Sequence, residues 1–103
     1  MALTVKRVRN FDCTSQFEKD WERLARSGRY KMQDLKKVML LVIANDGPLP
    51  PQYMDHPLQG EWQDQRDCHI AGDWLLLYTV RNEGTKKETV IFTRTGTHSE
   101  LFG

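Results

Sequence analysis

The chain has 103 residues, of which 39% are hydrophobic and 28% are charged, so we expect one globular domain over residues 1–103. Its longest apolar run, "VMLLVIA", is too short to cross a bilayer, and the amino-terminal "MALTVKRVRN" lacks the apolar stretch of a signal peptide. The two cysteines, Cys13 and Cys68, fit neither a disulfide framework nor a metal-binding spacing. These features favour a cytoplasmic protein with no membrane partner.

The formal net charge of +1 conceals an uneven distribution of charge along the chain. Residues 1–44 contain ten lysine and arginine residues against five acidic ones, whereas residues 45–103 contain five against nine. A basic half is compatible with a polyanionic partner such as a nucleic acid. The alternative is that these charges form ordinary solvated faces of helices.

The first half of the chain is predicted to form one strand and then two helices. Residues 3–8, "LTVKRV", alternate as a strand does. Residues 13–28 have apolar residues at three- and four-residue spacing, with Thr14 or Ser15 as a cap at the start and Gly28 as a stop, which is typical of an amphipathic helix. A second helix is predicted at residues 30–45, and its inward stripe comprises Met32, Leu35, Met39, Val42 and Ile43.

The second half is predicted to be a long loop followed by strands. Residues 46–62, "DGPLPPQYMDHPLQGEW", contain all four prolines, which exclude a helix or the interior of a sheet. Loops of this length are uncommon in compact domains and are often functional. Three strands are predicted next, at residues 63–70, 74–81 and 88–95. The order β-α-α-β-β-β, with a short helix at the tail, gives an α+β fold whose antiparallel sheet carries a helical hairpin on one face.

All three histidines lie in the acidic second half. His56 lies in the proline-rich loop, where a solvated histidine is the alternative to a catalytic one. In the first of the three later strands, alternation places Asp67 and His69 on one face and the apolar Cys68 and Ile70 on the other. We therefore expect Asp67 and His69 to point away from the core. A surface cross-strand pair is the alternative interpretation.

The tail, "RTGTHSELFG", contains the third histidine. Thr97 and Glu100 have the S/T-x-x-E spacing of a capping box, so a short helical turn is predicted to begin there, with His98 at its amino end. Free backbone N–H groups at such an end attract an anion such as phosphate, and Arg94 lies four residues upstream to bind the same anion. Packing of Phe102 would also order this turn, so the two interpretations are compatible.

Histidines, aspartates and an arginine on one sheet face predict proton transfer at a phosphodiester. Cleavage of RNA by its own 2′-hydroxyl needs a base, an acid and a cation beside the pentacoordinate phosphate. Histidine suits the first two roles at neutral pH and arginine suits the third, so no metal or other cofactor is required. A metal site is the rival, since gaps of 13 and 29 residues between the histidines neither support nor exclude it. A non-enzymatic binding module is a third interpretation.

Three segments carry a resemblance to a known family: "YMDHPLQGEW", "RDCHIAGDWLLLY" and "FTRTGTHSELFG". In order and spacing they resemble the YafQ group of bacterial toxins in the RelE/ParE superfamily, and the helical hairpin matches in pattern. The resemblance implies an α+β toxin of a type II toxin–antitoxin system, a ribosome-dependent endoribonuclease that enters the A site of the 30S subunit and cleaves mRNA there. It also implies a cognate antitoxin protein that silences the toxin.

The resemblance also implies which residues carry out this activity. The catalytic residues that it implies are His56, His69, Asp73, Arg94 and His98. The substrate-binding residues are Asp67, Trp74 and Phe102, of which the two aromatic ones would stack on a base, with packing as the alternative for Phe102. We expect His98 to be the general acid and Arg94 to stabilise the phosphorane. His56, or His69 with Asp73, would then act as the base.

Six basic residues on or between the two predicted helices are expected to contact ribosomal RNA rather than the scissile phosphate. They are Arg23, Arg26, Arg29, Lys31, Lys36 and Lys37. The alternative function is that of the ParE branch of the superfamily, which poisons DNA gyrase as a binding module without ribonuclease activity. That branch shares the fold without this histidine set, so the three histidines would then have no role.

Overall fold

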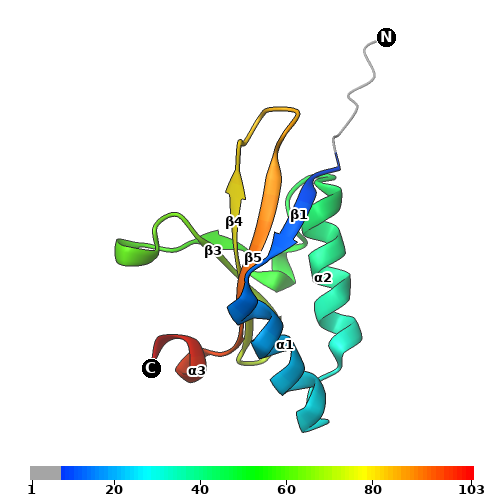
Figure 1. Cartoon of the computed structure of the whole chain (residues 1–103), viewed down its shortest axis with the longest axis vertical. Helices are drawn as coiled ribbons and strands as arrows, with labels where there is room; N and C mark the ends of the chain where they lie inside the picture. The colour runs from blue at the N-terminus through cyan, green and yellow to red at the C-terminus, as the bar shows by residue number, and fades with distance from the viewer. Residues whose placement is uncertain (1–7) are drawn as a thin grey trace.

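A five-stranded sheet lies between a helical hairpin and a short carboxy-terminal helix in the computed structural model, which describes residues 8–103 (Figure 1). The strand order is β1-β5-β4-β3-β2. The strands are β1 (Asn10–Cys13), β2 (His56–Pro57), β3 (Arg66–Ala71), β4 (Trp74–Arg81) and β5 (Thr89–Thr97). The predicted α+β class is confirmed. The prediction of a purely antiparallel sheet is wrong, because β1 pairs with β5 in parallel while the other strands pair antiparallel.

Within residues 8–103 the first strand is β1, and all but the last residue of the strand predicted at residues 3–8 lies outside that range. Val8 is in no strand, residues 3–7 lie outside the described residues, and β1 begins at Asn10. Alternation marks a segment that suits a sheet, but only a partner edge decides which residues pair. Here that edge belongs to β5, to which β1 runs parallel (Figure 1).

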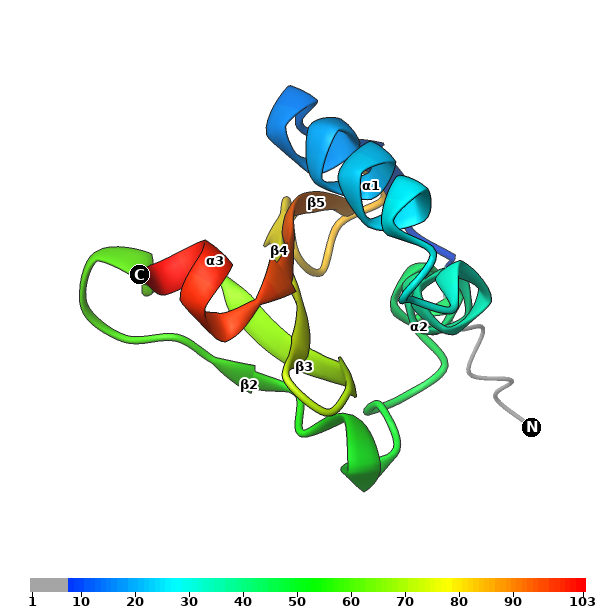
Figure 2. The same cartoon turned by 90° about the horizontal axis from the view of Figure 1, so that it is seen from below.

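Helices α1 (Ser15–Ser27) and α2 (Met32–Ala44) form the predicted hairpin on one face of the sheet, and α3 (His98–Phe102) lies on the other (Figure 2). The Thr14 hydroxyl accepts a hydrogen bond from the Phe17 N–H at 3.0 Å, and Gly28 ends α1 in the left-handed conformation, as its sequence predicts. Within residues 8–103, no helix has the length and apolar content needed to cross a membrane.

The main core lies between the helical hairpin and the sheet. Leu35 and Val42 of the predicted α2 stripe are buried there, and so is Val38, which the predicted stripe omitted. Cys68 and Ile70 of β3 face this core, as alternation predicts. A smaller cluster on the opposite face contains the buried Leu75, Leu77 and Leu101, with Leu58 and Phe102 packed against it.

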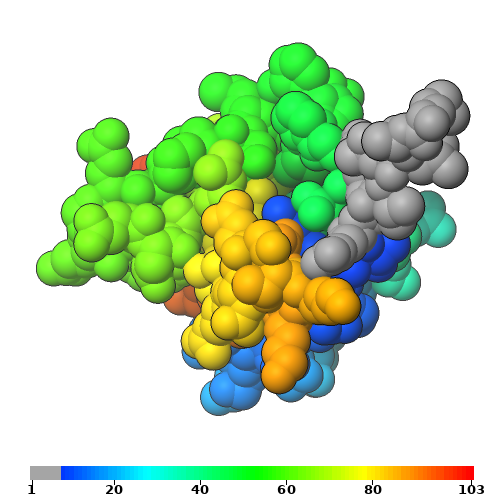
Figure 3. All heavy atoms as spheres, turned by 90° about the horizontal axis from the view of Figure 1, so that it is seen from above, coloured from blue at the N-terminus to red at the C-terminus, as the bar shows by residue number. Residues whose placement is uncertain are grey.

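The loop between α2 and β3 contains more regular structure than its prolines predict. It forms two short 3-10 turns, Pro51–Tyr53 and Gly60–Trp62, and the two-residue strand β2 between them. Pro57 is tolerated in β2 because this is an edge strand, where a missing N–H costs no ladder hydrogen bond. On the molecular surface the loop (green) stands beside the β4–β5 hairpin (yellow and orange) in Figure 3.

Candidate active site

Cross-strand pairing aligns three of the predicted site residues in one row across the sheet. His56 lies opposite Asp67, Asp67 opposite Leu77, and Leu77 opposite Arg94. Residues directly opposite each other project from the same face of a sheet. Leu77 belongs to the smaller cluster, so the side chains of this row leave the sheet on the face away from the helical hairpin.

A second row on the same face brings the remaining histidines to the same place. His69 lies opposite Leu75, and Leu75 lies opposite Gly96. β5 ends one residue after Gly96, at Thr97, and the chain then enters α3, which begins with His98. Residues from four separate segments therefore meet on one sheet face, as the alternation of β3 indicates.

Asp67 lies at the centre of this arrangement. The residue is 5% exposed, its Oδ2 lies 4.0 Å from Nε2 of His56, and its Oδ1 has no hydrogen-bond partner among residues 8–103. The rings of His56 and His69 lie with their centroids 6.4 Å apart. Burial raises the pKa of the Asp67 carboxyl, and the charges of His56, His69 and His98 oppose that rise. Asp67 is thus a buried carboxylate whose pKa is raised by burial and lowered by the charges of three histidines.

Hydrogen bonds fix both the ring of His56 and the loop that carries it. Its Nδ1 lies 2.6 Å from the Met54 carbonyl oxygen, which fixes the orientation of a ring that is otherwise about half exposed. The neighbouring Asp55 accepts hydrogen bonds from the Tyr78 hydroxyl at 2.7 Å and from the Arg66 guanidinium at 3.2 and 3.3 Å. These contacts anchor the loop directly beside its catalytic candidate.

The tail folds as its capping box predicts. The Thr97 hydroxyl accepts from the Glu100 N–H at 3.3 Å, and the Glu100 carboxylate accepts from the Thr97 N–H at 2.7 Å. Both of these N–H groups are therefore occupied within the capping box, and the anion site that the sequence analysis expects at this helix end stays a prediction. The carboxylate of Asp73, another of the predicted catalytic residues, accepts a hydrogen bond from the His98 N–H at 3.3 Å.

Phe102 packs within the tail. Its ring lies 5.0 Å from that of His98 and 5.4 Å, edge on, from that of Trp62, centroid to centroid. Trp62 comes from the loop between α2 and β3, and the sequence analysis missed it, although a tryptophan in a polar loop is itself a signal of local packing. The Phe102 ring therefore contacts both His98 and the loop.

The prediction that Trp74 stacks on a base is wrong. Its side chain is 4% exposed and lies in the main core, on the face of the sheet opposite to the histidines. The indole N–H donates to the Thr95 hydroxyl at 2.9 Å, and the Tyr30 ring packs edge on at 4.9 Å. A ring enclosed in this way has no free surface for a nucleotide.

Arg94 is paired with a residue that the sequence analysis missed. Its Nε lies 2.8 Å from Oδ2 of Asp20, and its Nη2 lies 3.3 Å from Oδ1. Asp20 is completely buried, on the face of α1 that also carries Phe17 and Leu24. An aspartate at the i+3 position of an apolar stripe is the signal that could have identified it, since a buried carboxylate needs a cationic partner.

The six predicted ribosome-binding residues divide into different environments. Arg23 contacts Asp20 at 2.9 Å and Glu100 at 3.4 Å, so it belongs to the site. Arg26 lies 3.8 Å from Glu22, and the Lys36 ammonium lies over the Trp21 ring. Lys37 is exposed on α2, whereas Arg29 and Lys31 line a groove of about 370 Å³ that also includes Asp73 and Trp74.

The described part of the chain contains no preformed metal-binding cluster. Among residues 8–103, no three histidine, cysteine, aspartate or glutamate side chains are grouped so as to hold a metal ion. The two cysteines are free, and Cys68 is buried in the main core on the other side of the sheet from the histidines.

Known proteins are similar to this chain in both sequence and fold. Residues 9–103 match the family described as "Bacterial toxin of type II toxin-antitoxin system, YafQ". The "mRNA interferase toxin YafQ" of Escherichia coli strain K12 is 42% identical over 95 residues, which are 92% of this chain and 97% of that protein. The crystal structure of YafQ from E. coli strain BL21(DE3) has a TM-score of 0.79 at 43% identity, over 92% of this chain and 99% of that one. The crystal structure of the E. coli DinJ–YafQ toxin–antitoxin complex also gives a TM-score of 0.79 at 43% identity, over 94% and 100% of the two chains.

Proposed function

The chain belongs to the YafQ family of bacterial toxins of type II toxin–antitoxin systems, and from this membership and the site we propose that it is an endoribonuclease that cleaves mRNA. The observation that carries the proposal is that His56 lies 4.0 Å from the buried Asp67, with the His69 ring 6.4 Å from the ring of His56. Arg94 starts from the same sheet face, and His98 follows at the end of β5. This set supplies an acid, a base and a cation without a metal ion. Residues 1–103 form one toxin domain in this proposal.

His56 is the proposed general base. When its Nδ1–H donates to the Met54 carbonyl, the neutral ring presents an unprotonated Nε2, which takes the proton of the 2′-hydroxyl as the 2′-oxygen attacks phosphorus. Asp67, 4.0 Å from that nitrogen, stabilises the imidazolium that forms. His69 with Asp73 is the less favoured base, because the Asp73 carboxylate contacts the backbone of His98.

His98 is the proposed general acid, and Arg94 is the proposed cation. His98 gives its proton to the 5′-oxygen as the bond between phosphorus and that oxygen breaks. The Arg94 guanidinium keeps Nη1 outside its pair with Asp20, so this nitrogen can donate to the phosphorane. The products are a 2′,3′-cyclic phosphate and a 5′-hydroxyl end. Phe102 orders His98 by packing and leaves part of its ring exposed to a base.

The proposed partners are a cognate antitoxin protein and the ribosome, with mRNA in the 30S A site as substrate, which places the reaction in the cytoplasm. The E. coli YafQ protein forms a complex with DinJ, and we infer a corresponding antitoxin for this chain. Arg29, Lys31 and Lys37 are the exposed cations best placed to contact ribosomal RNA. Replacing one of them by glutamine should reduce the salt dependence of ribosome binding by about one unit of logarithmic slope for each phosphate that the side chain neutralises.

The decisive experiment is cleavage of an mRNA on purified ribosomes by the wild type and by His56→Gln and His98→Gln. Each variant should fold and bind ribosomes, but cleave about 10²–10⁴-fold more slowly. Lys87→Gln, at the exposed hairpin tip, is the control and should cleave like the wild type. Cleavage should survive EDTA when polyamines keep the ribosomes intact. Products with 5′-phosphate ends would contradict the mechanism, and inhibition of gyrase without RNA cleavage would favour the ParE-like alternative.

A further inference from the structure

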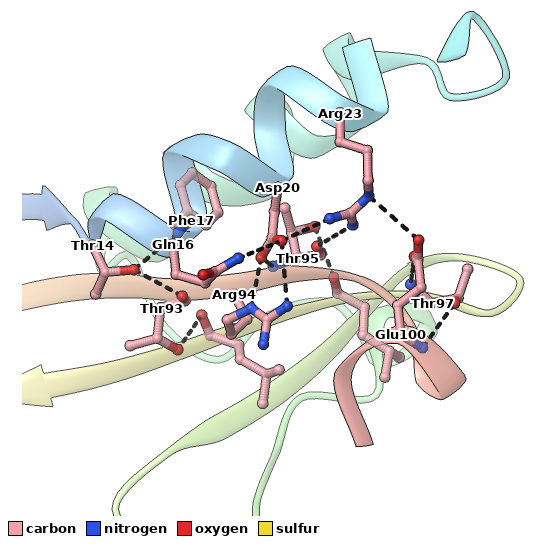
Figure 4. Close-up of polar contacts among 12 residues, drawn as sticks. Thr14, Gln16, Phe17, Asp20, Arg23, Thr93, Arg94, Thr95, Thr97 and Glu100 are labelled. Carbon is pink, nitrogen blue, oxygen red and sulfur yellow. Dashed lines mark hydrogen bonds and ion pairs between the residues drawn. The ribbon is translucent and has the colours of Figure 1, made fainter. Parts of the chain in front are cut away.

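The carboxylate of Asp20 in α1 accepts hydrogen bonds from four other residues (Figure 4). Arg94 donates to both of its oxygens, at 2.8 and 3.3 Å, and Arg23 donates to Oδ1 at 2.9 Å. The Thr95 N–H donates at 3.2 Å and the Gln16 amide at 3.3 Å. The carboxylate is completely buried, so the structure surrounds one charge with donors from α1 and from β5.

The position of Asp20 follows from the short length of β1. That strand ends opposite Phe92, so the edge of β5 beyond it has no strand to pair with, and α1 covers it instead. Burial by itself raises the pKa of Asp20, but hydrogen bonds from Arg94, Thr95 and Arg23 outweigh it and hold the pKa below the ordinary value of 3.8. Asp20 is therefore ionised at neutral pH and attracts both arginines.

Arg23 extends the same network to the tail. Its Nη1 binds Asp20, and its Nε lies 3.4 Å from Oε2 of Glu100. The other oxygen of Glu100, Oε1, accepts the Thr97 N–H and so closes the capping box of α3. A continuous path of polar contacts thus runs from the guanidinium of Arg94, through α1, to the turn that carries His98.

Gly96 leaves the space in which Arg23 and Glu100 meet. A Cβ at this position would lie 2.9 Å from Glu100 Oε1 and 3.1 Å from Arg23 Nη2. Its φ of +157° also lies in a region that side chains rarely adopt. A larger residue would have to displace the ion pair that crosses β5.

We propose that Asp20 and Arg23 are positioning residues that fix the spacing between Arg94 and His98. Asp20 sets the direction of the Arg94 guanidinium, and Arg23 ties the same carboxylate to the cap of α3. This role rests on the proposed function, in which Arg94 and His98 act on the same phosphate. A displacement of about 1 Å in such a pair can cost about 10²-fold in rate.

The test is a pair of double-mutant cycles on cleavage of mRNA bound to ribosomes, with ribosome affinity and melting temperature measured for every variant. Asp20→Asn is combined with Arg94→Gln, and Arg23→Gln with His98→Gln. Asp20→Asn should slow single-turnover cleavage by about 10²-fold and Arg23→Gln by about 10-fold, with ribosome affinity unchanged within about twofold. In the Arg94→Gln or His98→Gln background, the matching change should cost less than about threefold, because the group that it positions is gone.

The Arg23 cycle remains informative even if Asp20→Asn does not fold, because Arg23 is 44% exposed and its loss leaves no buried charge without a partner. Lys19→Gln, on the same helix, is the matched control and should cleave at the wild-type rate. Full activity of Arg23→Gln beside an active wild type would overturn the positioning role alone, and so would losses that multiply independently of the background. A wild type that does not cleave mRNA would instead contradict the proposed function on which the role depends.

Discussion

Replacement of Asp67 by asparagine should make the protein more stable and less active. The Asp67 carboxyl is buried, and its Oδ1 has no hydrogen-bond partner in residues 8–103. Burial raises its pKa above the ordinary value of 3.8, although the charges of His56, His69 and His98 oppose the rise. A carboxyl whose pKa is raised by folding binds protons more tightly in the folded state, so the free energy of unfolding falls as the pH rises above that ordinary value.

The size of the effect follows from the unpartnered oxygen. A buried polar atom without a partner costs about 1–3 kcal/mol, and the amide of asparagine removes the charge while it retains the shape. Because the amide also lacks a full set of partners, we expect a gain of about 1 kcal/mol, which in a domain of this size raises Tm by about 4–8 °C. The gain should be largest at pH 8 and should shrink towards pH 4, because the raised pKa lets the buried Asp67 carboxyl of the wild type bind a proton as the pH falls.

Thermal melts at pH 8, 6 and 4, together with cleavage assays at neutral pH, measure both effects. Asp67→Asn should melt higher than the wild type at pH 8 and cleave mRNA about 10²-fold more slowly, since the imidazolium of His56 loses its counter-ion. Asp64→Asn, at an exposed position nearby, is the control and should change neither property. A variant that melts lower than the wild type at pH 8, or a gain that does not depend on pH, would refute the reasoning.

Three further predictions address the surroundings of the site. Tyr78→Phe removes the hydroxyl that donates to Asp55 and should lower the free energy of unfolding by about 1 kcal/mol in denaturant titrations, with slower cleavage; unchanged stability would show that the bond is unimportant. Leu101→Ala should cost about 2 kcal/mol in the same titration and reproduce the cleavage defect of His98→Gln, because α3 loses its buried anchor; a fully active variant would contradict this. Cys68, which is fully buried and whose pKa burial raises, should resist iodoacetamide at pH 8 until guanidinium unfolds the protein; equal rates in both states would contradict the fold.

Several parts of this structure follow from neighbouring residues in the sequence. Thr14 begins α1 and Gly28 ends it, because a capping side chain and a left-handed C-cap residue each act within one helical turn. The predicted strand at residues 74–81 coincides with β4, and the capping box begins α3 at the predicted place. Alternation in β3 also separates Asp67 and His69 from the main core, since the period of a strand is two residues wherever it pairs.

Pairing across the sheet decided which residues of the site meet. His56 reaches Asp67 only because β2 forms on the edge of β3, which the proline content of the loop argued against. Trp74 follows Asp73 directly in the chain, yet it faces the main core. Asp73 lies in the turn before β4, whereas Trp74 is the first residue of that strand and its side chain is buried in the main core, so two adjacent residues of one sequence motif lie in different surroundings.

The partner of Arg94 was likewise decided by tertiary structure. Asp20 and Arg94 are 74 positions apart, and they meet because β1 is too short to cover β5 and α1 takes its place at that edge. For the same reason Arg23 pairs with Asp20 and Glu100. Periodicity and capping arise from contacts within a few residues, and the sequence displays them directly. A buried charge instead selects its partner by proximity and the exclusion of water, and both exist only once the chain has folded.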